Sequence, residues 1–335
     1  MSTGDAAVEL PIAFSGQRLD WRDLPRPVRG RIEELAHAQV TVEIGATTGF
    51  SPGFASVLEL SDGHAVFVKA VSPEQNPASV ALARAEIRVS ASLPLHVPAP
   101  RLLWSHDDGT WVVLGFEAVP GLAPELPWRP QDLRLVLDAL VPLADAEPLP
   151  GHDLPRADDV LAEDFTGWRR LAARGGAAEL DRAGDDARMP WPRDLADWCR
   201  THLDRLVLWE QAALPVLAGD ALVHGDLRAD NIMIDESRTV WFIDWPHASV
   251  GAPWLDLAFM LPSVALQGGG APHAIFRDHP VADGVGDDDL RAALAGLAGY
   301  FVWGARQPAP RGIPNLRPFQ HAQGMATLEW LRGLT

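Results

Sequence analysis

The sequence predicts an α+β protein of two lobes, a β-rich N-terminal lobe followed by a mainly helical C-terminal lobe. Short apolar runs separated by turn residues fill positions 40–70, whereas most of the long amphipathic stretches come after position 120. The dipeptide Pro120-Gly121 stands where this texture changes. We therefore divide the chain into a lobe at 1–117 and a lobe at 118–335.

The N-terminal lobe is expected to hold a leader helix, a three-strand meander, a second helix and two more strands. Pro25 to Gln39 has apolar residues at helical spacing, and the turn Ser61-Asp62-Gly63-His64 separates two strand-like runs. The remaining runs alternate or are continuously apolar, as strands are. The predicted strands lie at 40–45, 55–60, 65–70, 102–104 and 111–119, and the second helix lies at 77–93.

The C-terminal lobe is expected to be helical with one interruption. Two apolar runs, Ile232–Ile234 and Val240–Ile243, flank a polar turn and predict a tight β-hairpin. From Trp254 onward the pattern is helical again, with a break at the glycine run 268–270. Before the hairpin, the predicted helices are 131–146, 158–174 and 194–217.

Composition and charge narrow the function classes. The 335 residues include 28 Lys and Arg against 45 Asp and Glu, a net charge of −17. This charge repels nucleic acid and anionic membranes, so neither is an expected partner, and it favours cationic small molecules. No apolar run reaches about 18 residues and no signal-peptide pattern is present, which predicts a cytoplasmic protein. The acidic stretches 158–164 and 283–289 are interpreted as solvated faces or, alternatively, as part of an acceptor groove.

Lysine and cysteine each occur once in the chain. Lys69 is the sole lysine, and every other basic residue among the 28 is Arg. Because Lys69 follows Val68, the Gly-Lys-Ser/Thr of a P-loop is absent. A lysine kept in such a chain suggests a role that the larger planar guanidinium of Arg fills poorly. Cys199 is the sole cysteine, which excludes a disulfide within the chain and a cysteine-based zinc site.

The clearest chemistry lies in VHGDLRADNIMI at 223–234 and WFIDW at 241–245. Asp226 is a candidate to orient and deprotonate a hydroxyl group, while Asn231 and Asp244 offer oxygen ligands for Mg²⁺ held between phosphates. The hairpin returns the chain so that Asp244 can face the loop. A surface turn rich in Asp and Asn is the alternative.

These two motifs resemble the catalytic loop and metal-binding aspartate of protein-kinase-like phosphotransferases. The form HGDLRADN followed by FIDW is closest to the aminoglycoside phosphotransferase family. The resemblance implies a protein-kinase-like fold with a nucleotide between the lobes. It also implies Mg²⁺-dependent transfer of the γ-phosphoryl of ATP, or of GTP as the alternative, to a hydroxyl of a small molecule. Aminoglycosides, other amino-sugars and antibiotics are among the acceptors it implies; the oligomeric state is not indicated.

The resemblance implies roles for residues outside the loop as well. Lys69, in FVKA, would hold the α- and β-phosphates, and Glu86, in RAEI, would pair with it; a solvated helix carboxylate is the alternative for Glu86. In LGFEAVPG, the carbonyl of Phe116 and the amide of Ala118 would bind the adenine edge. Asp256, in PWLDLA, would brace the catalytic loop. Two hairpin residues complete the nucleotide-binding set, Met233 and Ile243.

The sequence departs from the family pattern at two places. The loop over the phosphates is expected to be rich in glycine, but ATTGFSPGFA at 46–55 has two glycines, with Ser51 as a candidate phosphate contact. Arg228 stands where the family more often has His. We interpret Arg228 as a catalytic cation that neutralises the transferred phosphoryl group, with a salt bridge to a neighbouring carboxylate as the alternative.

Two other function classes follow from the same residues. GFSPG at 49–53 matches the nucleophile elbow of a serine hydrolase, with Ser51 as nucleophile, although the residues after Gly53 alternate as a strand where an elbow requires a helix. A catalytically silent regulatory protein that only binds nucleotide would use the same fold. Every catalytic residue type is present, which favours the enzyme.

Overall fold

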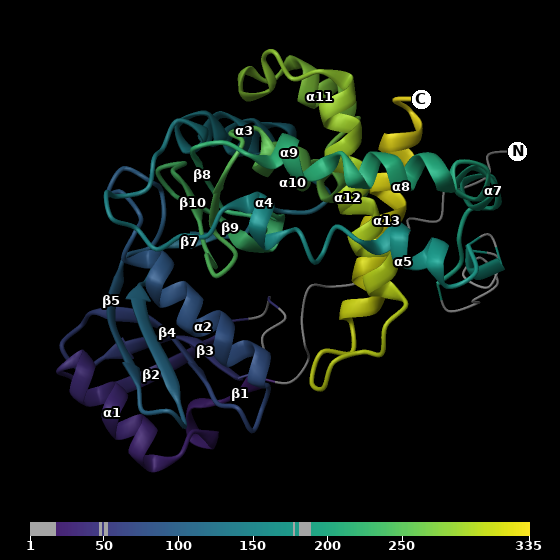
Figure 1. Cartoon of the computed structure of the whole chain (residues 1–335). Helices are drawn as coiled ribbons and strands as arrows, with labels where there is room; N and C mark the ends of the chain where they lie inside the picture. Colours follow the sequence, from purple (N-terminus) through teal and green to yellow (C-terminus); the bar gives the residue numbers. More distant parts are fainter. Residues whose placement is uncertain (1–17, 47–48, 50–52, 177, 181–188) are drawn as a thin grey trace, which may run out of the picture.

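The chain folds into two lobes, a sheet-containing N-terminal lobe and a larger helical C-terminal lobe (Figure 1). The structure is a computed structural model that describes residues 18–46, 49, 53–176, 178–180 and 189–335. The candidate phosphate contact Ser51 lies outside the described residues. The two-lobed α+β class is confirmed. The boundary between 117 and 118 stays a prediction.

A six-stranded sheet forms the N-terminal lobe, with the strand order β1-β3-β4-β6-β5 and with β2 paired to β3. The predicted meander is confirmed, because β2, β3 and β4 pair antiparallel in sequence order. Strand β1 pairs with β3 in parallel. The strands are β1 (Arg18–Leu19), β2 (Val40–Gly45), β3 (Gly53–Leu60), β4 (Ala65–Val71), β5 (Leu102–Asp107) and β6 (Val112–Glu117).

Helices α1 (Arg26–Ala36) and α2 (Pro77–Ser90) bury the two faces of this sheet. Val28 and Ile32 of α1 pack into one apolar cluster, and Val80 and Ala83 of α2 pack into another. Helix α2 begins where the Asn76 side chain accepts hydrogen bonds from two backbone N–H groups of the first turn. The sheet therefore has a buried strand β4 whose alternate residues face α1 and α2.

The C-terminal end of α2 is tied to the helical lobe. Leu149 N donates to Ser92 O at 3.0 Å, and Phe242 N donates to Pro98 O at 2.7 Å. Both acceptors lie just after α2, and both donors belong to the C-terminal lobe. Helix α2 is thus fastened to both lobes, and Figure 1 shows it on the side of the sheet that faces the helices.

The C-terminal lobe is built around α12, which packs against α13, α8, α5 and α9. None of the helices that the structure describes is long and apolar enough to cross a membrane. The α-helices are α3 (Pro130–Ala144), α4 (Ala157–Val160), α5 (Gly167–Ala173), α7 (Arg193–Thr201), α8 (Leu203–Gln211), α9 (Ala213–Leu217), α10 (Leu255–Leu266), α11 (Pro272–Asp278), α12 (Asp287–Ala305) and α13 (Leu316–Arg332). Three 3₁₀ turns lie at Trp21–Asp23, Ala229–Asn231 and Pro280–Ala282.

Two predicted helices are wrong as single elements. The segment 158–174 is interrupted between α4 and α5, and 194–217 is three helices, α7, α8 and α9. Gly167 begins α5 where the backbone of Gly299 in α12 lies too close to admit a Cβ, so packing sets this start. The break at Ala212 places Pro215 in the first turn of α9, where a missing N–H costs no hydrogen bond.

Short strands hold the central part of the C-terminal lobe. The predicted hairpin is confirmed as β9 (Ile232–Asp235) and β10 (Val240–Phe242), and β7 (Gly121–Leu122) pairs with β9. A second pair joins β8 (Ala221–Val223) to β11 (Ser249–Gly251). The loop 224–231 leaves β8 and enters β9, so both of its ends are held by hydrogen-bonded strands.

Candidate functional site

A cleft of about 730 Å³ lies between the two lobes. The N-terminal sheet contributes apolar side chains such as Val57 and Phe67 to its lining, and the C-terminal lobe contributes Met233 and Phe259. The charged residues that the sequence predicts to be functional come from both lobes and line this same cleft. We call the part beside Lys69 the phosphate end and the part formed by 160–165, 297–301 and 313–323 the acceptor end, after the roles proposed for them below.

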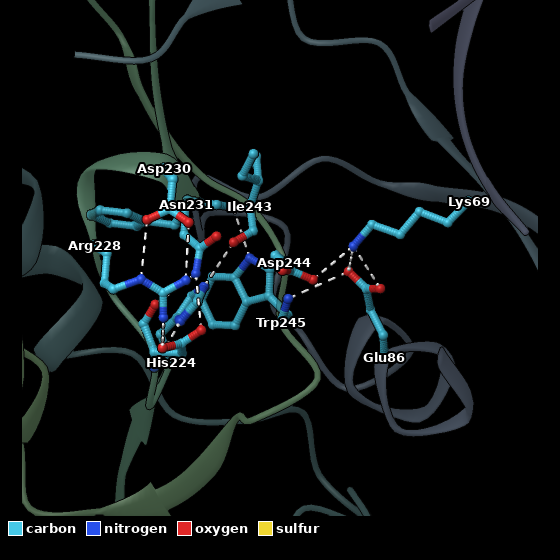
Figure 2. Close-up of polar contacts among 11 residues, drawn as sticks. Lys69, Glu86, His224, Arg228, Asp230, Asn231, Ile243, Asp244 and Trp245 are labelled. Atoms are coloured by element: carbon cyan, nitrogen blue, oxygen red, sulfur yellow. Dashed lines mark hydrogen bonds and ion pairs between the residues drawn. The ribbon is translucent and has the colours of Figure 1, made fainter. Parts of the chain in front are cut away.

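Lys69, Glu86 and Asp244 meet at the phosphate end (Figure 2). Lys69 Nζ donates to both carboxylate oxygens of Glu86 and to Asp244 Oδ1, each at 2.8 Å. Lys69 comes from β4, Glu86 from α2, and Asp244 from the residue pair after β10. Glu86 is therefore not a solvated helix carboxylate, because it is 4% exposed and paired.

Burial and ion pairing have opposite effects on the pKa of each of these three groups. Burial alone would lower the pKa of Lys69, but the carboxylates of Asp244 and Glu86 raise it above its ordinary value. The pKa of Asp244 falls to about 2 because Lys69 outweighs the effect of burial. Burial raises the pKa of Glu86, and Lys69 opposes that rise. Lys69 therefore stays protonated, and Asp244 stays ionised, at neutral pH.

The backbone of Asp244 has a left-handed conformation, with φ of 66°. This is an uncommon conformation for a residue other than glycine, and it turns the chain sharply after β10. Ile243 N donates to Asn231 O at 2.9 Å, so the end of the hairpin is joined to the end of the loop 224–231, which we call the catalytic loop. Asn231 and Asp244 are consequently held on adjoining segments that face the cleft.

Asp226, Arg228, Asp230 and Asn231 form one network in the loop. Figure 2 labels the last three of these residues. Arg228 pairs with Asp226 Oδ1 through Nη1, and with both oxygens of Asp230 at 3.0 and 2.9 Å. Asn231 Nδ2 donates to Asp226 O at 2.7 Å and to Asp226 Oδ2 at 3.1 Å. The salt-bridge alternative for Arg228 is the arrangement that the structure shows, and both oxygens of Asp226 are engaged.

Two buried residues, Asp256 and His224, hold this loop in place through hydrogen bonds. Asp256 accepts hydrogen bonds from His224 N at 2.8 Å and from Gly225 N at 2.9 Å, as the sequence predicts. His224 donates from Nε2 to Ile243 O at 3.0 Å and accepts at Nδ1 from Asp226 N. Burial lowers the pKa of His224 to about 4, so the ring is neutral and can both donate and accept. The backbone before Asp226 is thereby fixed.

Asp226 is half-buried beside the cleft, with its side chain 30% exposed, and this partial removal from water raises the pKa of its carboxyl group. The positive charge of Arg228 opposes this rise, and so does His247. A carboxylate of raised pKa accepts a proton more readily than an ordinary aspartate. The loop thus presents a fixed base of increased basicity to whatever occupies the cleft.

Of the other predicted nucleotide contacts among the described residues, all but Ala118 line the cleft. Phe116, Met233 and Ile243 line the cleft, and the ring centroid of Phe116 lies 5.7 Å from Lys69 Nζ. Ala118 does not line it, although the residues on both sides of Ala118 do. The roles of these residues stay predictions.

Sequence reasoning missed Arg18 at the phosphate end. Arg18 in β1 lines the cleft, burial lowers its pKa, and the negative charge of Asp244 opposes that lowering. A Cβ placed on Gly49 would lie 2.7 Å from Arg18 Nη2, so a larger residue there would require the guanidinium to shift. The φ of 98° at Gly49 also disfavours other residues. A strand of two residues carries no periodic pattern, and no sequence signal was available to find Arg18.

The acceptor end was also missed, apart from one acidic stretch. Asp164 lines the cleft, as the groove alternative for 158–164 predicted, together with Tyr300, Gln320 and His247. No residue of 283–289 lines it, and Asp287 begins α12 instead, so the groove alternative is wrong for that stretch. The acceptor end comes from segments far apart in sequence, which share no local motif.

Comparisons with known proteins agree with this geometry. The model of the phosphotransferase enzyme family matches residues 47–300. The chain is similar to the aminoglycoside 3'-phosphotransferase of Streptomyces fradiae, with 31% identity over 48% of this chain and 57% of that protein. It spans 8% to 60% of the lengths of the three curated relatives that it matches.

Solved structures show the same fold at low sequence identity. A spectinomycin phosphotransferase in complex with ADP and spectinomycin has a TM-score of 0.59 at 12% identity, covering 91% of this chain and 98% of that one. A thermostable aminoglycoside phosphotransferase mutant in complex with ADP and hygromycin B has a TM-score of 0.56 at 16% identity, with the same coverage. Taken with the match of the family model, this shows that the chain belongs to the phosphotransferase enzyme family.

Proposed function

We propose that this protein transfers the γ-phosphoryl group of ATP to a hydroxyl group of a small molecule. The observation that carries the proposal is the convergence of Lys69, Glu86 and Asp244 from both lobes on a cleft that also holds Asp226 and Asn231. The cleft therefore holds the three kinds of group that phosphoryl transfer uses: a cation for the phosphates, oxygen ligands for a metal ion, and a base for the attacking hydroxyl group. The neighbours crystallised with ADP support a nucleotide in this cleft, and GTP stays the alternative donor.

Asp226 is the group that would act on the acceptor. Its raised pKa suits a base that takes the hydroxyl proton as the acceptor oxygen bonds to the γ-phosphorus. The bond from the γ-phosphorus to the bridging oxygen then breaks, and ADP leaves. Asn231 and Arg228 hold the two carboxylate oxygens of Asp226, so a hydroxyl must approach through the remaining lone pairs. Arg228 thus positions Asp226, and this role replaces direct contact with the phosphoryl group in the proposal.

The residues present fit a magnesium ion. Asp244 stays ionised, and Asn231 uses its Nδ2 within the loop, which leaves its Oδ1 for a metal. No group of three or more His, Cys, Asp or Glu side chains suited to a metal occurs among the described residues. Two protein ligands are what Mg²⁺ uses when phosphate oxygens complete its shell. When bound, the ion would neutralise charge on the phosphate oxygens.

The two rival classes have less support. Gly53 begins β3, so GFSPG leads into a strand and lacks the strand-to-helix turn of a nucleophile elbow. A silent nucleotide-binding protein would not need a carboxyl group of raised pKa that is open to the cleft, as that of Asp226 is. The geometry therefore favours the enzyme over both alternatives.

The test is the substitution Asp226→Asn. Turnover should fall by about 10²–10⁴-fold, because Asn keeps the shape but cannot take a proton. ATP affinity should change little, since no hydrogen bond or ion pair joins Asp226 to Lys69, Glu86 or Asp244. An ADP-release assay over a panel of hydroxylated acceptors measures the first, and calorimetry with a non-hydrolysable ATP analogue measures the second.

Asp220→Asn is the matched control. Asp220 precedes β8 and its side chain is 96% exposed, so the same change of charge should leave turnover unaltered. Wild-type turnover in the Asp226→Asn variant would refute the base assignment. Nucleotide binding by the wild type without phosphoryl transfer to any acceptor would favour the silent binding protein.

A further inference from the structure

The acceptor end of the cleft has a largely aromatic wall. Phe165, Phe259, Tyr300, Phe301 and Phe319 all line it. The ring centroids of Phe165 and Phe259 are 6.2 Å apart in an edge-to-face arrangement, and those of Tyr300 and Phe301 are 5.2 Å apart. Rings arranged in this way offer apolar surface to a ligand, together with negative ring faces that attract a cation.

Charged groups are few at this end. Among the described residues of 160–165, 297–301 and 313–323 that line it, Asp164 is the one Asp, Glu, Lys or Arg side chain, and His247 lines the cleft nearby. Within the loop, Arg228 pairs with Asp226 and Asp230, so two carboxylates share one guanidinium. Arg228 also lies over the ring of Phe319, with Cζ 5.1 Å from the centroid.

Asp164 is the one carboxylate here whose side chain makes no hydrogen bond or ion pair to another described residue. It is exposed to the cleft, in the turn between α4 and α5. Tyr300 of α12 lies close to it, and burial together with the charges of Asp164 and Asp226 raises the pKa of Tyr300 to about 12. His247 and Arg170 of α5 also act on Asp164 and oppose the rise in its pKa that burial causes. Asp164 and Asp226 therefore border the same space from two sides.

We propose that the acceptor is an alcohol with a largely apolar body and one positively charged amine, which Asp164 binds while the aromatic wall covers the body. The inference rests on the proposed function. A second or third ammonium group on the ligand would find no free carboxylate among the described residues of the acceptor end. Removing such a group from water without a partner is costly, so polycationic aminosugars are poor acceptors.

Three compounds separate charge from shape. Propranolol has one amine, one hydroxyl and a naphthyl body; naphthyloxy-propanediol keeps the hydroxyl and the naphthyl body without the charge; neomycin is a polycationic aminosugar. Calorimetry on the full chain with a non-hydrolysable ATP analogue measures affinity independently of turnover. We expect propranolol to bind at least roughly tenfold more tightly than either of the others.

A variant locates the charge. Asp164→Asn should weaken propranolol binding roughly tenfold and leave binding of the neutral diol unchanged, because only the amine loses its partner. Glu163→Gln is the matched control: it makes the same change of charge on the adjacent residue, whose side chain does not line the cleft. It should alter neither affinity.

The outcomes separate the inference from the proposed function. Tighter binding of neomycin than of propranolol, or an equal effect of Asp164→Asn on the amine and the diol, overturns the inference. Phosphoryl transfer to neomycin with the larger kcat/KM also overturns it and leaves the proposed function standing. Selective amine binding without transfer to any acceptor contradicts the proposed function alone.

Discussion

The two ends of the cleft differ in how their charged side chains are paired. At the phosphate end, Lys69, Glu86 and Asp244 come from both lobes and bind one another at 2.8 Å. At the acceptor end, aromatic rings form the wall. Asp164 makes no side-chain hydrogen bond or ion pair to another described residue there, although His247 and Arg170 act on it at longer range. Substitutions within a network of buried charges have large and interdependent effects on free energy, whereas substitutions of separate groups have small and additive effects. The following tests use this difference.

The largest effect is expected at Lys69. Lys69→Arg keeps the charge, but its planar fork does not fit a position where a single atom meets three carboxylate oxygens. Breaking a buried ion pair costs about 3–5 kcal/mol, so kcat/KM for ATP should fall by at least about 10²-fold. The KM for the acceptor should stay unchanged. Steady-state kinetics with each substrate varied in turn measures both.

Arg84→Ala is the control for Lys69. Arg84 lies on the same helix as Glu86, and its ion pair with Asp107 is open to solvent, so it contributes little. Near-normal ATP use by the Lys69→Arg variant would mean that the phosphate end is not an interdependent network.

The next effect concerns Asp256, beneath the loop that joins the two ends. Burial raises the pKa of Asp256 to about 6, although the N–H groups of His224 and Gly225 oppose this. Between pH 4 and 6 the folded protein holds a proton that the unfolded chain has released, so this stabilisation is lost as the pH rises through 6. The unfolding free energy of the wild type relative to Asp256→Asn should fall by on the order of 3 kcal/mol across that window.

Urea unfolding at a series of pH values measures this difference. The exposed Asp220→Asn variant should show a constant difference from the wild type over the same range. A constant difference for Asp256→Asn as well would show that the folded-state carboxyl titrates as it does in the unfolded chain.

Arg18 gives a smaller effect, confined to the phosphate end. Arg18→Ala removes a cation on which the charge of Asp244 acts. A charge-assisted hydrogen bond from this cation to a phosphate oxygen of bound ATP would be worth about 1.5–3 kcal/mol. We expect KM for ATP to rise about tenfold or more, with KM for the acceptor unaltered. An equal rise in both constants would place Arg18 outside the phosphate end.

The smallest effect is expected at Tyr300, in the acceptor end. Tyr300→Phe keeps the ring and removes a hydroxyl that is worth about 1 kcal/mol. KM for the acceptor should rise by less than about tenfold, and KM for ATP should not change. A change in KM for ATP would show that the two ends are coupled.

Local patterns explain why the phosphate end could be predicted. The catalytic loop, the hairpin and Asp244 lie within one short stretch, and Lys69 and Glu86 lie on a consecutive strand and helix. Alternation and helical spacing likewise gave the meander, α1, α2 and the hairpin. Where residues that act together are also close in sequence, their spacing is informative.

The remaining features depend on tertiary contacts. Asp164, Tyr300 and Phe319 come from three separate elements, and packing around α12 alone brings them to one cavity. The breaks at His202 and Ala212 hardly disturb the apolar periodicity, so 194–217 reads as one helix. Arg18 belongs to a strand too short to produce a pattern.

The attachment of α2 to the helical lobe has a consequence for regulation. In protein kinases the corresponding lysine and glutamate are joined or separated by movement of the helix. Here the backbone bonds at Ser92 and Pro98 fasten the end of α2 to the opposite lobe, and Trp245 N donates to Glu86 Oε1 at 3.4 Å. Moving the helix outward would break these bonds together. We therefore expect an enzyme that is constitutively active, with its output set by the supply of acceptor.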